Sequence, residues 1–271
     1  MVMVCPSEYG GTKAAVAASR MQATFPNVRF SLMVGIGGGI PNSSLDIRLG
    51  DIVVSFPSEQ GPGVIQYDLG RVTVSEFVRK CTLSKPPGLL LQAVNDLRSR
   101  SGVAKGLAEM LEKAPQIEDE EGDLYGQAYP SDLKDTLFRP EYEHIKSDPP
   151  CECERENKEH TDNAITRKKR NHQNPRIHYG NIASGSAVMK NARERDALAK
   201  RDNVICFEME AFGLMDDFQC LVIRGICDYS DSHKNKEWQP YASSVAAAYA
   251  KRLLHVVPPE EVAKLKPVRS E

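Results

Sequence analysis

Two kinds of hydrophobic pattern alternate along the chain. Residues 12–25 repeat alanine, valine and methionine at helical spacing and end before Pro26, which predicts a helix. The unbroken apolar run from Phe30 to Ile36 is typical of a parallel strand that is buried on both faces. A short strand is expected to end before the turn at 6–11. The other expected strands are 51–56, part of 66–74, and the first residues of the segments 177–189, 204–218 and 220–231. The other expected helices are 89–100, 103–114, 194–202, the end of 204–218 and 238–257.

This order of elements predicts the fold class. Strands that alternate with helices form a mostly parallel sheet with helices on both faces. We therefore expect one α/β domain over residues 1–271, with three layers (α/β/α) around a mostly parallel, mixed central sheet. Ligands of such sheets bind at the carboxyl ends of the strands, so side chains at those ends are the first site candidates.

Residues 115–176 break the pattern, because they are polar and charge-dense and show no period. We interpret them as a surface insertion that is at least partly disordered. Cys151 and Cys153, with His144 and His160 nearby, would make half of a metal site, but CxC is not the usual CxxC spacing and we expect no metal. The run 167–170 (RKKR) would suit nucleic acid or a nuclear signal, but a solvated charge run is the preferred interpretation.

Composition narrows the classes of function. A hydrophobic content of 41% is enough for one large core, and a net charge of −2 gives no argument for nucleic acid or an anionic membrane as partner. No apolar stretch approaches the ~18 residues that a membrane span needs, and the first residues are unlike a signal peptide. The seven cysteines are odd in number and irregularly spaced, so we expect reduced thiols and a cytoplasmic location.

Three predicted strand ends carry residues suited to chemistry. Residues 35–39 (GIGGG) would let backbone N–H groups approach a ligand, although a tight turn alone also explains them. Glu208 and Glu210 follow an apolar strand, so one of the two carboxylates points inward and needs hydrogen-bond donors. The two hydroxyls of a sugar diol are such donors. The alternative is an ordinary helix N-terminus, where acidic residues are favoured. Asp228 ends a buried strand, a position where the pKa of a carboxyl group is often perturbed and where the group would suit a proton donor. The alternative is that Asp228 only caps a helix or forms a turn.

Taken together, the segments 34–55, 177–189, 206–215 and 222–231 resemble the nucleoside phosphorylase family. Its members include purine nucleoside phosphorylases, uridine phosphorylases and methylthioadenosine/adenosylhomocysteine nucleosidases. FEMEA followed by RGICDYSD is the most specific part of the resemblance. It implies cleavage of the N-glycosidic bond of a small, preferably purine, nucleoside by water or phosphate. The fungal branch is the most similar, and its members are often fused to NTPase or ankyrin-repeat modules.

The resemblance also implies roles for single residues. Asp228 would be the general acid at purine N7, Glu210 would bind the ribose 2′- and 3′-hydroxyls, and Met209 would pack against the sugar. The remaining implied site residues are Glu208 beside the sugar, Val188 and Met189 at the base pocket, and Gly37 and Gly38 on a turn that forms the site floor. The family needs no metal or organic cofactor, apart from phosphate as a possible co-substrate, and a homo-oligomer is implied.

The sequence departs from the family at its start. The family has an earlier strand and loop, which carry the water-activating Glu of the nucleosidases or the phosphate loop of the phosphorylases. Only 34 residues precede Gly35 in this chain. Glu8 is the only early Glu, and it lies in a different element from the water-activating Glu. A sheet without that strand is expected to expose an edge or an apolar patch. Gly10, Gly11 and Thr12 match the next turn, where a helix N-terminus can hold an anion or nucleophile. That turn lacks an Arg, which favours hydrolysis. The alternative is a catalytically impaired nucleoside-binding or regulatory module.

The loop that follows Asp228 holds the last candidates. Trp238 and Tyr241 are expected to pack the final helix. The loop itself would be able to close over the site, with His233 as a candidate contact for the 5′ group of a substrate.

Overall fold

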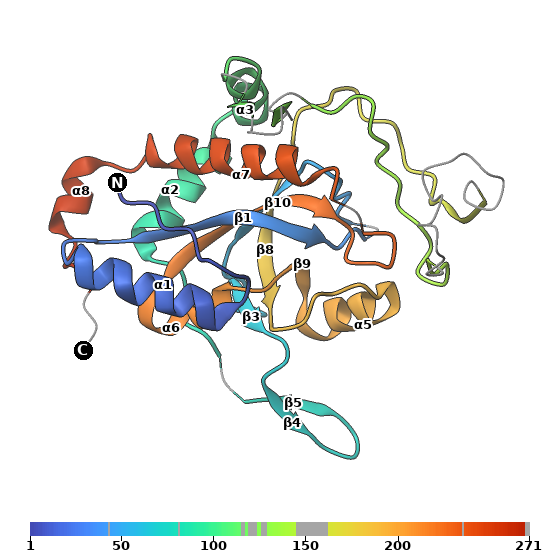
Figure 1. Cartoon of the computed structure of the whole chain (residues 1–271), viewed down its shortest axis with the longest axis horizontal. Helices are drawn as coiled ribbons and strands as arrows, with labels where there is room; N and C mark the ends of the chain where they lie inside the picture. Colours follow the sequence, from blue (N-terminus) through green and yellow to red (C-terminus); the bar gives the residue numbers. More distant parts are fainter. Residues whose placement is uncertain are drawn as a thin grey trace.

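Five of the predicted strands and the segment Val64–Gln66 pair into one six-stranded sheet in the order β2-β10-β1-β9-β8-β3 (Figure 1). The strand predicted within 66–74 lies mainly at Gly70–Val72, in a separate two-stranded pair. The structure is a computed structural model that describes residues 1–42, 44–80, 82–114, 129–144, 162–234 and 236–268, and the backbone of 117–118 and 124–125. The strands are β1 (Ser31–Gly39), β2 (Ile52–Ser55), β3 (Val64–Gln66), β8 (Ile177–Ser184), β9 (Val204–Glu208) and β10 (Cys220–Asp228).

The pairing of these strands is mostly parallel, as predicted. β1 runs parallel to β10, and β8 runs parallel to β2, β3 and β9, whereas the β1–β9 and β10–β2 pairs are antiparallel. Because the first half of β8 pairs with β2 and its second half with β9, the strands β2, β10, β1, β9 and β8 form a closed ring. Closure of a sheet on itself removes free edges between its strands.

Helices cover both faces of the sheet, which confirms the three-layer prediction (Figure 1). Side chains alternate along β10: Leu221 and Ile223 pack with the helices on one side, and Cys220 and Val222 with those on the other. The first side holds α2 (Gly88–Ser99), α3 (Val103–Glu112) and α7 (Gln239–Leu254). The second holds α1 (Gly11–Thr24), η1 (Ala211–Gly213) and α6 (Met215–Phe218). The remaining elements are α5 (Ala192–Asp202), α8 (Pro259–Lys264), the pair β4 (Gly70–Val72) with β5 (Phe77–Arg79), and the pair β6 (Ile117–Glu118) with β7 (Leu124–Tyr125).

Two predictions about the first forty residues are wrong. The opening of the chain has no strand: residues 1–6 have no regular structure, and Met3 is exposed, because no strand pairs with them. The run from Phe30 is not buried on both faces, since Val34 in the middle of β1 is 40% exposed. Within the described strands, β1 pairs along its length with β10 but meets β9 only at Gly38 and Gly39.

The described parts of the insertion pack on the domain. Leu137 and Phe138 are buried, and Phe138 forms an isolated β-bridge with Ala164. Trp238 and Tyr241 are buried in the core at α7, as predicted, and both rings meet Tyr129 edge-on. Of the helices that the structure describes, none has the length and apolar character that crossing a membrane requires.

Candidate active site

Three strand ends meet at Gly38. In the sheet register, Gly38 stands beside Asp228 of β10 on one side and beside Phe207 of β9 on the other. A Cβ atom on Gly38 would lie 1.9 Å from the Ser230 Oγ atom and 2.7 Å from Asp228 Oδ1, so only glycine permits this approach. The prediction that Gly37 and Gly38 form a turn is wrong, because β1 continues through Gly39 with a register shift between the two. Gly38 nevertheless lies beside Asp228, the predicted general acid, and Gly37 precedes it in the strand.

Asp228 is buried and accepts hydrogen bonds on both carboxylate oxygens. The Ser230 N–H donates to Oδ1 at 2.8 Å, while Lys234 Nζ at 2.8 Å and the Cys227 thiol at 3.2 Å approach Oδ2. Burial raises the pKa of Cys227, which keeps it a protonated donor. Burial lowers the pKa of Lys234, but the adjacent Asp228 carboxylate outweighs this, so the pKa lies above its usual value. Asp228 therefore has a charged, proton-bearing partner.

A buried arginine joins the two glutamates. Glu208 is completely buried, accepts hydrogen bonds from the N–H groups of Glu210 and Ala211, and forms an ion pair with Arg224. Arg224 Nη2 also lies 3.2 Å from Glu210 Oε2. The pKa of Arg224 is raised, because the two carboxylates outweigh the effect of burial. The inward-pointing carboxylate that the sequence predicts is Glu208. The Glu210 side chain keeps 15% of its surface exposed, so it is the one that a ligand can reach.

The predicted anion loop lies next to Glu210. The Gly10 N–H at the start of α1 points at Glu210 Oε1 across 3.4 Å. Gly11 is packed against Phe212, whose ring would be 2.4 Å from a Cβ atom at this position, and Thr12 is exposed. Glu8 forms an exposed salt bridge with Lys13 at 2.7 Å. The N-terminus of α1 is thus adjacent to Glu210, the residue predicted to bind the ribose, and the Gly10 N–H faces a carboxylate.

The other predicted site residues differ in their surroundings. Met209 is partly buried, Val188 is half exposed, and Met189 is buried with Phe207 in the core cluster beside α5. The His233 ring packs 4.2 Å from the Phe138 ring and 5.2 Å from the Tyr142 ring, measured between centroids. The structure does not test the ligand contacts predicted for these residues, which stay predictions. The described residues hold no group of three His, Cys, Asp or Glu side chains arranged for a metal, and Cys151, Cys153 and His160 lie outside them.

Sequence reasoning missed Arg224 and Lys234. Arg224 is the single charged residue in the apolar run 221–226, and a charge at that place indicates a buried ion pair. Lys234 lies in a polar loop with another lysine two residues on, so no local signal distinguishes it.

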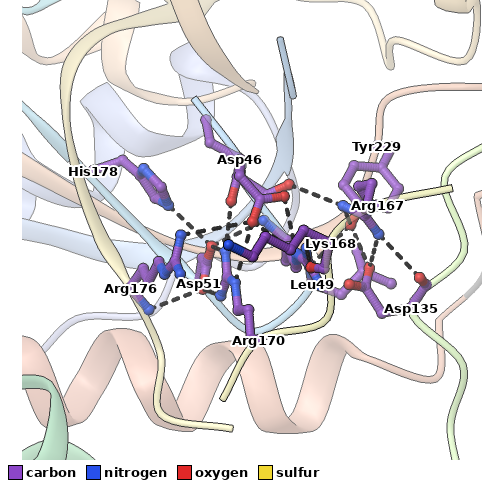
Figure 2. Close-up of polar contacts among 12 residues, drawn as sticks. Asp46, Leu49, Asp51, Asp135, Arg167, Lys168, Arg170, Arg176, His178 and Tyr229 are labelled. Atoms are coloured by element: carbon purple, nitrogen blue, oxygen red, sulfur yellow. Dashed lines mark hydrogen bonds and ion pairs between the residues drawn. The ribbon is translucent and has the colours of Figure 1, made fainter. Parts of the chain in front are cut away.

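Two arginines of the insertion are anchored in the domain (Figure 2). Arg170 Nη1 and Nη2 bind the two oxygens of the buried Asp51 at 2.6 and 2.7 Å, and His178 Nε2 lies 2.9 Å from the same carboxylate. Arg167 donates to the Tyr229 hydroxyl at 2.8 Å and pairs with Asp135 at 2.9 Å. The expected solvated run is therefore wrong for Arg167 and Arg170, because carboxylates distant in sequence draw them inward. Lys168 and Lys169 are exposed, as expected.

The Asp51 contacts predict a pH-dependent stability. Burial raises the pKa of Asp51, but hydrogen bonds from Arg170 and His178 outweigh it and leave the pKa below the usual 3.8. Because the folded pKa is the lower one, the stabilisation is present above about pH 4 and is lost as the pH falls through the folded value. Asp51→Asn should lower the free energy of unfolding by about 1–3 kcal/mol at pH 7 and weaken its decline in acid.

Urea unfolding between pH 7 and pH 3 measures both effects. Asp96→Asn is the matched control, because Asp96 forms an exposed pair with Arg100 on α2 and should change neither stability nor slope appreciably. An unaltered pH slope in Asp51→Asn would contradict the assignment.

Known proteins share this fold. No protein-family model matches the sequence. A nucleotide-binding leucine-rich repeat (NLR)-like protein of Hyaloscypha variabilis is 47% identical over 269 residues, 99% of this chain, and the chain spans 26% of that protein's length. The solved 5′-methylthioadenosine/S-adenosylhomocysteine nucleosidase of S. pneumoniae, in complex with a transition-state inhibitor, superposes with a TM-score of 0.53 at 14% identity. That match covers 93% of this chain and 80% of the nucleosidase.

The corresponding nucleosidase of Neisseria meningitidis, in complex with methylthio-immucillin-A, gives a TM-score of 0.51 at 16% identity. It covers 92% of this chain and 78% of the nucleosidase. The chain therefore has the nucleoside phosphorylase/nucleosidase fold that the resemblance of its strand ends implies.

Proposed function

We propose that the chain cleaves the N-glycosidic bond of a purine nucleoside with water as the nucleophile. The observation that carries this proposal is the arrangement of three carboxylates on a nucleosidase fold. Asp228 ends β10 on one side of Gly38, Glu208 and Glu210 lie at and just after the end of β9 on the other side, and Arg224 of β10 joins the two glutamates. Breaking the bond builds positive charge on the ribose and negative charge on the base. A carboxylate beside the sugar and a proton donor beside the base stabilise these two charges.

Glu210 is assigned to the ribose. Arg224 holds its Oε2 atom, and the partial exposure of its side chain leaves lone pairs for two hydroxyl donors. A neutral ribose diol suits this carboxylate. Glu208 accepts only protein donors in the described contacts and serves to orient Arg224 and the turn at Ala211.

Asp228 is assigned to the base, with Lys234 as its proton source. To act as a general acid, Asp228 must carry a proton when the C–N bond breaks. The Lys234 ammonium, 2.8 Å away, can pass one proton to Asp228 as Asp228 passes one to N7. The ammonium then recovers its proton from solvent, because its side chain is 24% exposed.

The choice of water over phosphate rests on the start of α1. The Gly10 N–H faces the Glu210 carboxylate, so a phosphate dianion at this helix N-terminus would meet a negative charge 3.4 Å from that N–H. Water meets no such repulsion.

The function is tested by measuring base release from adenosine, inosine, guanosine, uridine and methylthioadenosine, with and without phosphate. We expect free purine base without phosphate. Release that requires phosphate would exclude water as the nucleophile. No release from a sample that melts cooperatively would exclude cleavage.

Glu210→Gln should damage ribose recognition specifically. Loss of a charged hydrogen bond to the diol should lower kcat/KM on ribonucleosides about 10- to 100-fold, with little effect on the 2′,3′-dideoxyribonucleoside of the same base. Steady-state kinetics on the matched substrate pair measures this. Glu194→Gln, on the exposed side of α5, is the control and should match the wild type. Equal losses on both substrates would rule out the contact.

A second candidate function is nucleoside sensing within a larger protein. It is favoured by the relative from Hyaloscypha variabilis, which is named as NLR-like and is matched over only 26% of its length. A sensing module should be stabilised by nucleoside in a thermal melt without releasing base, whereas the enzyme should release it.

A further inference from the structure

A cavity lies apart from the carboxylates of the candidate active site. It has a volume of about 640 Å³ and lies between the loop that follows β1 and residues 165–171 of the insertion. Asp228, Glu208 and Glu210 do not line it. Its size is that of a small-molecule site, about 300–1,000 Å³.

Basic side chains dominate this cavity. Six of its lining residues are Arg48, Arg167, Lys168, Lys169, Arg170 and Arg176. In the described contacts these six meet three carboxylates. Asp46 binds Arg48, Arg170 and Arg176, Asp51 binds Arg170, and Asp135 binds Arg167. Within the part of the chain that the structure describes, Lys168 and Lys169 have no carboxylate partner. The cavity therefore has an excess of three positive charges.

The arginines that line the cavity are held in place by carboxylates (Figure 2). The side chains of Arg167 and Arg170 are only 12% and 11% exposed and are fixed by the Asp135 and Asp51 carboxylates. Arg48 Nη2 donates to the Lys168 carbonyl at 2.6 Å, which fixes the backbone that carries the lysine pair. A site whose cations are already positioned loses little entropy when an anion binds.

One wall of the cavity is apolar. Leu137 and Ile165, joined by a backbone hydrogen bond at 2.8 Å, line it, and Ile165 is 39% exposed although it is a large hydrophobic residue. Pro41 lines the cavity from the loop that follows β1. Inorganic phosphate would use only the cations, and an extended nucleic acid would need a charged stripe rather than a cavity of this size. A phosphate attached to a flat apolar body uses both the cations and the apolar wall.

We propose that this cavity binds a nucleotide. Its phosphates lie against Lys168, Lys169 and Arg176, and its base and sugar lie on the wall formed by Leu137 and Ile165. This site is separate from the candidate active site, so the proposal does not depend on cleavage of a nucleoside.

The proposal is tested by calorimetric titration of the whole chain with ATP. Lys168→Glu/Lys169→Glu should weaken binding about tenfold or more, because it reverses two charges at the phosphates. Lys80→Glu/Lys85→Glu is the matched control. It reverses two exposed lysines, one directly after β5 and one in the segment before α2, neither of which lines the cavity, and it should bind ATP like the wild type. Thermal melts verify that both variants fold, as expected for exposed positions.

Competition experiments identify what is recognised. Tripolyphosphate should displace ATP but bind more weakly, and adenosine should not displace it. Four outcomes would overturn the proposal: unchanged ATP affinity in Lys168→Glu/Lys169→Glu, displacement by adenosine, tripolyphosphate binding as tight as that of ATP, or tighter binding of a single-stranded oligonucleotide. Absence of base release in the nucleosidase assay would leave this proposal intact.

Discussion

Asp228→Asn is expected to slow base release by about 10²- to 10⁴-fold while the protein remains folded. The asparagine keeps the shape of the side chain, and its amide oxygen can still accept the Ser230 N–H that now binds Oδ1. The amide cannot receive the Lys234 proton and pass it to N7. The variant should therefore lose transition-state stabilisation at the base and retain nucleoside binding.

The measurement is kcat on the preferred nucleoside, compared with kcat on a nitrophenyl riboside whose leaving group departs as an anion. Asp228→Asn should be slow on the nucleoside and close to the wild type on the activated riboside, since that leaving group needs no proton. A variant equally slow on both substrates would show that Asp228 does not act as the acid. Glu194→Gln, a substitution of an exposed side chain on α5, should leave both rates unchanged.

The sequence predicts most of the elements because each strand is a compact apolar run and each long helix repeats at its own period. Residues 30–36, 52–55 and 220–227 show this directly. The closed ring of strands could not be predicted. It depends on β8 pairing with β2 through its first half and with β9 through its second, and neither pairing leaves a local signal. The failure at residues 1–6 has the same cause, because a short apolar run becomes a strand only where a partner exists.

The residues of the candidate site also divide into those that the sequence identifies and those that it does not. Glu208, Glu210 and Asp228 are found from the sequence because carboxylates at the ends of apolar strands are rare unless something pairs with them. Arg167 and Arg170 are misjudged because a run of four cations predicts solvation. Their burial depends on Asp51 and Asp135, which lie 119 and 32 residues away in the chain. Local charge density cannot report such partners.

Arg224→Met is expected to lower the free energy of unfolding by about 3–5 kcal/mol. Methionine matches the length of the arginine stem, which packs beside Gly37, whereas the guanidinium lies beside Gly35, so the change is chiefly the loss of charge. It leaves Glu208 completely buried with only backbone donors and removes one partner of Glu210. A buried carboxylate without its cation costs much more than the net contribution of the pair itself.

A double-mutant cycle with Glu208→Gln separates this effect from lost packing. Since the double variant contains no unpaired charge at position 208, urea unfolding should show it to be more stable than Arg224→Met alone. If the two single losses simply add, Arg224 stabilises the fold through packing and not through Glu208. The cycle also bears on the site, because Arg224 positions Glu210. Kinetics on the double variant should therefore show impaired ribose recognition even where the folding stability has recovered.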